Sequence, residues 1–154
     1  MKLPVDRQLL EEPTRLILAN YRRLLGHDLV APGGDEVDAL FEAPRVVLSA
    51  LGPFGSDHRF NYANRQGLQL FGYSWDELIG KPSSTSAEPV HRDERRRLLD
   101  EVGKRGFIEN YSGIRIGKSG QRFRIENATV FNLLDTDDRY LGQAATFATW
   151  QPLI

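Results

Sequence analysis

The sequence predicts an α+β domain, in which a five-stranded antiparallel sheet carries helices on one face and follows an N-terminal helical extension. Apolar residues recur at helical spacing near the N-terminus, and alternating strand-like runs fill the last third of the chain. A length of 154 residues fits one hydrophobic core. We therefore divide the chain into a helical extension over residues 1–44 and the α+β domain over residues 45–154.

The first predicted helix covers residues 13–25 and ends at Gly26. Its apolar stripe comprises Leu16, Ile17, Tyr21, Leu24 and Leu25. A preceding helical turn or two should meet it at Pro13, where we expect a kink because proline has no amide hydrogen to donate. A short second helix is predicted over residues 35–41.

The middle of the chain predicts a hairpin followed by helices. Strands at residues 45–51 and 59–63 should pair with each other. Asn64 can cap a helix that runs to residue 71, and Ser74 with Glu77 forms a capping box that opens another short helix. A longer helix is predicted over residues 92–104. It should turn Leu98, Leu99 and Val102 inward.

The last third predicts an antiparallel meander of three strands, at residues 107–116, 121–134 and 140–150. Strict alternation gives the middle strand one inward face, made of Phe123, Ile125, Asn127, Thr129, Phe131 and Leu133. An error of one residue in this register would turn Asn127 and Thr129 outward.

Composition excludes several classes of function. The chain has no cysteine, which removes disulfides, zinc–thiolate sites, cysteine nucleophiles and cysteinyl-flavin photochemistry. With 20 basic and 21 acidic residues it has no net field to hold a polyanion or an anionic membrane. The N-terminus lacks the apolar core of a signal peptide, and no apolar run approaches the ~18 residues of a membrane span. We expect a cytoplasmic protein without nucleic-acid or membrane partners.

The sequence positions of the histidines and arginines do not predict a functional site. His27, His58 and His91 lie far apart in the sequence, so we predict no metal site. The arginines at 92, 95, 96 and 97 alternate with acidic residues, and we expect them to form a solvated, ion-paired helix face.

Residues 60–82, FNYANRQGLQLFGYSWDELIGKP, resemble the segment of PAS domains in which an asparagine follows the second strand. The chain is still more similar to the MEKHLA domain, a PAS-like module that also occurs as free-standing bacterial proteins. The similar segments are FNYANR (60–65), SAEPVHRDERRRLL (86–99), YSGIR (111–115), GQRFRIENATVFNL (120–133) and GQAATFATW (142–150). The resemblance implies a PAS-like fold for residues 45–154 and a sensory or interaction role without catalysis.

We therefore predict a non-catalytic sensory module that couples a small-molecule or partner signal to protein–protein interaction. A pure dimerisation or interaction module with a filled core is the alternative. A small α+β enzyme is a third interpretation, although no pair of titratable residues stands out. A homodimer is predicted because the N-terminal apolar stripe needs a surface on which to be buried, either the sheet or another subunit.

The predicted ligand site is a cavity between the sheet and the helix at residues 92–104, and its cofactor is unknown. Its candidate residues are Tyr62, Asn64, Phe71, Leu98, Tyr111, Phe123, Asn127 and Thr129. Asn127 and Thr129 are included because a buried amide or hydroxyl without a partner costs about 1–3 kcal/mol. For each polar candidate there is a structural alternative: Asn64 can serve only as a helix cap, Asn127 can tie down a loop, and Thr129 suits any strand.

Overall fold

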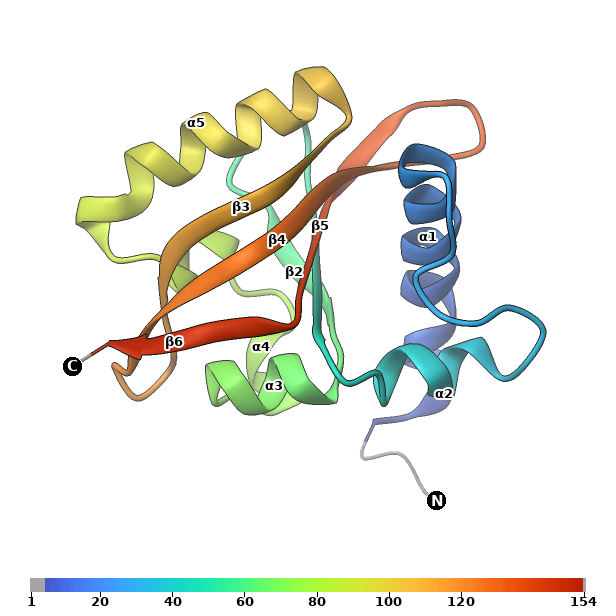
Figure 1. Ribbon diagram of the computed structural model, residues 1–154, viewed down its shortest axis with the longest axis horizontal. Helices are drawn as coiled ribbons and strands as arrows, with labels where there is room; N and C mark the ends of the chain where they lie inside the picture. Colours follow the sequence, from blue (N-terminus) through green and yellow to red (C-terminus); the bar gives the residue numbers. More distant parts are fainter. Residues whose placement is uncertain (1–4, 154) are drawn as a thin grey trace.

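The computed structural model describes residues 5–153 and has the predicted α+β architecture (Figure 1). The helices are α1 (Arg7–Leu25), α2 (Glu36–Phe41), α3 (Arg65–Phe71), α4 (Trp75–Leu78) and α5 (Pro89–Arg105), with a 3-10 turn η1 (Ser83–Ser86). The strands are β1 (Val46–Leu51), β2 (Arg59–Ala63), β3 (Phe107–Ile116), β4 (Arg122–Leu134), β5 (Tyr140–Phe147) and β6 (Thr149–Leu153). No helix within residues 5–153 is long and apolar enough to cross a membrane.

The sheet has the strand order β2-β1-β5-β4-β3 and is antiparallel throughout, and β6 also pairs with β4. It is six-stranded because the last predicted strand is divided in two. The pairs Thr129↔Thr146 and Ile125↔Trp150 show that β5 and β6 follow one register along β4. The break lies beside Asn127, whose φ of 51° takes the backbone out of the extended conformation.

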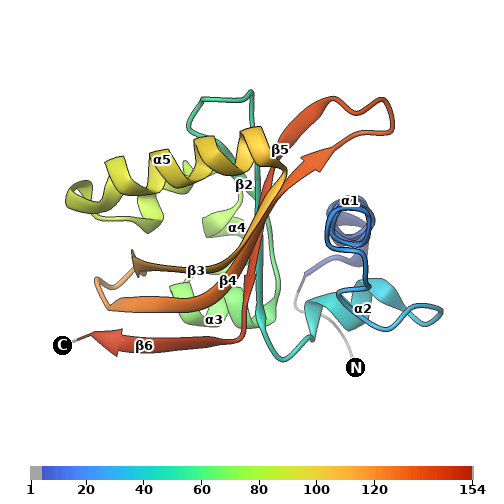
Figure 2. The same ribbon diagram turned by 45° about the horizontal axis from the view of Figure 1, so that its top comes forward.

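Helices lie on both sides of the sheet (Figure 2). Helices α3, α4 and α5 cover one face, as predicted, and a core that includes Phe71, Leu98 and Phe123 lies beneath them. The extension, α1 and α2, covers part of the opposite face and encloses a second core around Ile17 and Phe131. The sheet is therefore the middle layer of the molecule where α1 packs.

Helix α1 runs from Arg7 to Leu25 with Pro13 inside it, so the two expected segments form one helix. Asn20 fastens the helix to the end of β4. Its amide nitrogen donates to the Leu134 carbonyl over 3.1 Å, and its Oδ1 accepts from the Leu134 amide over 3.0 Å. The apolar stripe that motivated the homodimer is thus buried within the same chain.

Candidate functional site

A cavity of about 90 Å³ lies between the sheet and α5. It is lined by Leu48, Ser49, Ala50, His58, Phe60, Phe71, Ser83, Ser86, Arg95, Leu98, Leu99, Tyr111, Arg115, Ile125, Val130, Gln143, Ala144, Ala145 and Phe147. Most of this wall is apolar. The polar exceptions come from α5, from β1, β3 and β5, and from the segments that follow β1 and precede α5.

Helical periodicity brings Arg95 into the cavity. Arg95, Leu98 and Val102 are the buried residues of α5, and they share one face because they are separated by three and four positions. The side chain of Arg95 is 7% exposed, and its Nη2 donates to Ser83 Oγ over 2.7 Å. The helix thus buries a positive charge on its inward face.

A second arginine enters the cavity from β3. Arg115 is also 7% exposed; its Nη1 donates to the Ile114 carbonyl over 2.8 Å and its Nη2 to the Tyr111 hydroxyl over 3.2 Å. The guanidinium carbon lies 5.6 Å from the centre of the Tyr111 ring. Burial, followed by the charge of Arg115, lowers the pKa of Arg95 to about 10.

Side-chain amides attach the C-terminal half of α5 to the sheet. Gln143 Nε2 donates to the Leu99 carbonyl over 2.8 Å, and Asn132 Nδ2 donates to the Gly103 carbonyl over 3.1 Å. Gln143 also donates to Asn132 Oδ1. The bonds to Leu99 and Gly103 thus attach the helix to β5 and β4.

Of the predicted ligand residues, Phe71, Leu98 and Tyr111 line the cavity. Phe123 lies behind Phe71, with ring centres 5.2 Å apart and planes at 75°, and belongs to the same core. Tyr62 is fully buried but belongs to the second core, on the side of α1. The structure therefore brings part of the predicted set together and separates the rest.

The predicted inward face of the middle strand was wrong beyond Ile125. Asn127 is exposed, and the alternation is offset by one residue there, so that Ala128 and Val130 continue the face of Ile125. Thr129 instead alternates with Val130 and points to the opposite face with Phe131. The cause is a paired irregularity: Asn127 and Asn110, in the neighbouring strand, both have positive φ.

Asn64 lies outside the cavity, among backbone groups. It is fully buried, its Oδ1 accepts from the Gly67 amide as a helix cap, and it also binds the backbone of residues in α2 and before or in β1. Its position supports the capping role that was one of its two alternatives.

Sequence reasoning missed the two buried arginines. Arg95 was expected on a solvated helix face and is instead buried, which corrects that prediction. Two signals were available. Arg95 lies three positions before Leu98, which was predicted to face inward, and Arg115 lies four positions after Tyr111 on a strand, where even spacing means the same face.

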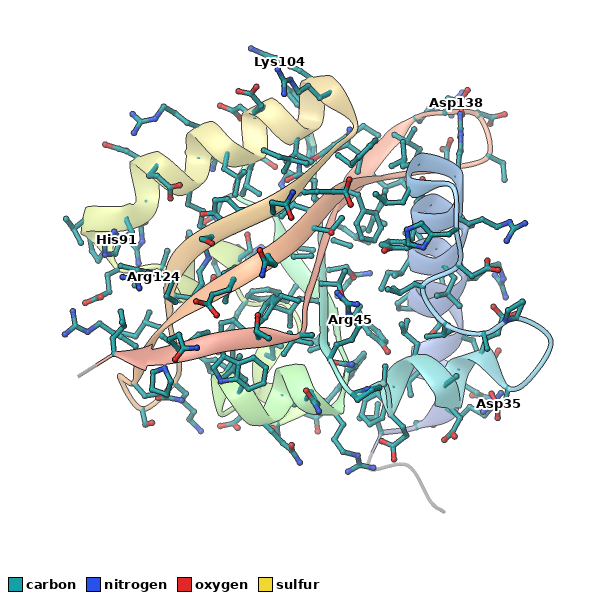
Figure 3. All side chains as sticks on the ribbon, viewed as in Figure 1. Asp35, Arg45, His91, Lys104, Arg124 and Asp138 are labelled. Atoms are coloured by element: carbon teal, nitrogen blue, oxygen red, sulfur yellow. The ribbon has the colours of Figure 1, made fainter. Side chains whose placement is uncertain are left out.

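No three His, Asp or Glu side chains within residues 5–153 gather into a possible metal site. His91 lies in the first turn of α5, at the outer end of the helix (Figure 3). His58 borders the cavity. Its Nδ1 donates to the Ser56 carbonyl over 2.9 Å, because a carbonyl can only accept, and its Nε2 faces the Tyr140 hydroxyl at 2.7 Å.

His58 predicts a pH dependence of stability. Burial and the nearby positive charges of Arg96 and Arg95 lower the pKa of His58 below the ordinary 6.5. The hydrogen bond to the Ser56 carbonyl and the charge of Asp57 raise it, but by less. The unfolded chain therefore binds a proton more readily, and stability should fall as the pH drops from 6.5 through the folded-state pKa. Urea unfolding between pH 7.5 and 5 should show this loss, and His58→Gln should flatten it. An unchanged slope in the variant would assign the loss to other groups.

Comparison with known proteins supports this architecture. The MEKHLA domain family model matches residues 11–152. No curated protein sequence matches the chain. The PAS domain of a protein from Colwellia psychrerythraea has a TM-score of 0.61 at 14% identity, over 75% of this chain and 92% of that one. A light-oxygen-voltage domain studied with a flavin analogue has a TM-score of 0.55 at 20% identity, over 77% and 84%.

A third similar structure is the light-state dimer of the fungal blue-light photoreceptor Vivid, with a TM-score of 0.53 at 18% identity, over 78% of this chain and 98% of that chain. At these identities the likeness establishes a common PAS-like fold.

Proposed function

We propose that this chain, which belongs to the MEKHLA domain family, senses a small molecule in the cavity beneath α5 and passes the occupancy of that cavity to a partner protein. The observation that supports this proposal most directly is the cavity, because it lies between α5 and the sheet and is lined by polar groups of both. The proposal describes a cytoplasmic, non-catalytic protein without a nucleic-acid partner.

The signal would travel through the position of α5. Apart from Arg95, this helix buries only Leu98 and Val102, and hydrogen bonds from Gln143 and Asn132 supply further attachment. A ligand that contacts Arg95 adds an interaction to one position of α5 that the other position lacks. This difference in binding is what shifts the population between the two positions. The surface around α5 would then differ between the empty and the occupied protein.

A flavin does not fit this cavity. Drug-sized ligands occupy sites of about 300–1,000 Å³, and the space here is about 90 Å³. The chain also has no cysteine to form a flavin adduct. The likeness to light-oxygen-voltage domains therefore supports a common fold without a common cofactor.

The proposal predicts a bound molecule and a response of α5. Native mass spectrometry of freshly purified protein should find added mass, and hydrogen exchange should show slower exchange of the α5 amides when it is present. Ala145→Leu should fill the cavity and abolish both effects, because Ala145 lines it, whereas Ala148→Leu changes an exposed residue and should preserve them. The proposal would be contradicted if the wild-type protein carried no added mass and if no added small molecule changed the hydrogen exchange of the α5 amides.

The small volume of the cavity favours a second candidate, an interaction module with a nearly filled core. In that case Ala145→Leu would leave partner binding unchanged. The homodimer remains a prediction under either candidate. Because the chain buries the stripe of α1 itself, an interface between two copies would have to use another surface.

A further inference from the structure

The cavity beneath α5 is lined by two arginine side chains, Arg95 and Arg115, that no carboxylate of the described residues contacts directly. Within residues 5–153, no carboxylate oxygen forms an ion pair with Arg95 or Arg115. Most N–H donors of both side chains also have no hydrogen-bond partner among these residues. Buried charges in proteins are ordinarily paired, so a counter-ion is the missing component.

The nearest carboxylates are separated from the arginines by hydroxyl groups. Asp57 faces Ser83 Oγ at 3.5 Å and is occupied by Ser84, whose amide and hydroxyl both donate to it. Glu94 accepts from the Tyr111 hydroxyl over 3.3 Å. Each acid thus leaves its arginine's guanidinium group without a direct ionic contact, and both arginines line the same cavity.

We propose that the cavity binds a short aliphatic monocarboxylate whose carboxylate group accepts hydrogen bonds from Arg95 and Arg115. This inference rests on the proposed function and names its ligand class. The planar guanidinium fork matches a carboxylate, whose two oxygens can accept from both arginines and whose single charge offsets one of the two positive charges.

The apolar part of the wall determines the remainder of the ligand. Leu48, Phe60, Ile125, Val130 and Phe147 offer no hydrogen bonds. An apolar tail can lie against them, whereas a phosphate would place oxygens there without donors. A volume of about 90 Å³ is well below the ~300 Å³ at which drug-sized sites begin, so the tail is short.

The test is an NMR titration of the full chain, in carboxylate-free buffer, with butyrate, its neutral analogue butyramide, and inorganic phosphate. Butyrate should bind, and the other two should bind at least tenfold more weakly. Arg95→Met and Arg115→Met should each weaken butyrate binding at least tenfold. Arg124→Met is the matched control, because this exposed arginine lies on the outer face of β4 (Figure 3), and its butyrate affinity should stay unchanged.

The melting temperatures of the two arginine variants show whether a loss of binding comes from a lost site or from an unfolded protein. Replacing a buried unpaired charge by methionine should leave the melting temperature equal or raise it. If either variant fails to fold, the comparison of butyrate with butyramide in the wild type decides. Equal binding of these two probes, phosphate binding as tight as butyrate, or butyrate binding unaffected in both folded variants would overturn the inference.

The proposed function can survive that result. If butyrate does not bind but native mass spectrometry finds another molecule in the cavity, the ligand class is wrong and the sensory role stands. If no molecule is found and nothing alters exchange in α5, both fail.

Discussion

Asn64→Ala should lower the free energy of unfolding by roughly 4 kcal/mol, because it leaves several buried backbone groups unpaired at once. The Oδ1 atom accepts from the amides of Val47 and Gly67, each over 3.0 Å. The Nδ2 atom donates to the carbonyls of Leu40 and Arg45, over 3.2 and 2.7 Å. One side chain thus joins the end of α2, the beginning of β1 and the beginning of α3. Urea unfolding at equilibrium measures the loss.

Asn61→Ala is the matched control, since it removes the same side chain from a half-buried position nearby. Asn61 accepts one hydrogen bond, from Ser49 Oγ over 2.7 Å, so the expected cost is about 1 kcal/mol. Equal costs for the two variants would show that the Asn64 bonds contribute little. A variant at Asn64 that kept its stability but lost a ligand would instead support the ligand-binding alternative for this residue.

Features of the fold that depend on neighbouring residues could be predicted from the sequence. The cap at Asn64 and the capping box of Ser74 and Glu77 both occur as expected, because each capping bond joins groups three residues apart in the sequence. The start of α5 was placed three residues too late. It begins at Pro89, where the missing amide hydrogen costs nothing in a first helical turn.

The candidate site was harder to predict because it depends on a backbone irregularity and on tertiary contacts. Alternation along β4 fails at Asn127, where φ is positive. Glycine is the usual residue at a positive φ, but asparagine also tolerates it, so the irregularity has no clear sign in the sequence. Arg95 and Arg115 were assigned to the surface or left aside because charged residues are seldom buried. That the two meet in one cavity follows from how α5 lies over β3, which no local pattern encodes.

Ile17→Asp should lower the free energy of unfolding by about 5 kcal/mol or more, which approaches the whole stability of an ordinary domain. Ile17 is fully buried in the core between α1 and the sheet, together with Tyr21 and Phe131. The substitution removes the apolar contacts of the isoleucine and places a carboxylate in an apolar core. Circular dichroism during urea unfolding should find the variant largely unfolded or with a much lower midpoint.

Leu9→Asp introduces the same group into the same helix at a position that is 53% exposed, and its cost should stay below about 1 kcal/mol. This pair of variants distinguishes an apolar stripe of α1 that packs on the chain's own sheet from one that packs on a second copy of the chain. If the stripe packed on a second copy of the chain, Ile17→Asp would give a folded monomer with nearly the stability of a wild-type subunit. Because the stripe covers the chain's own sheet, the substitution should cost the fold itself.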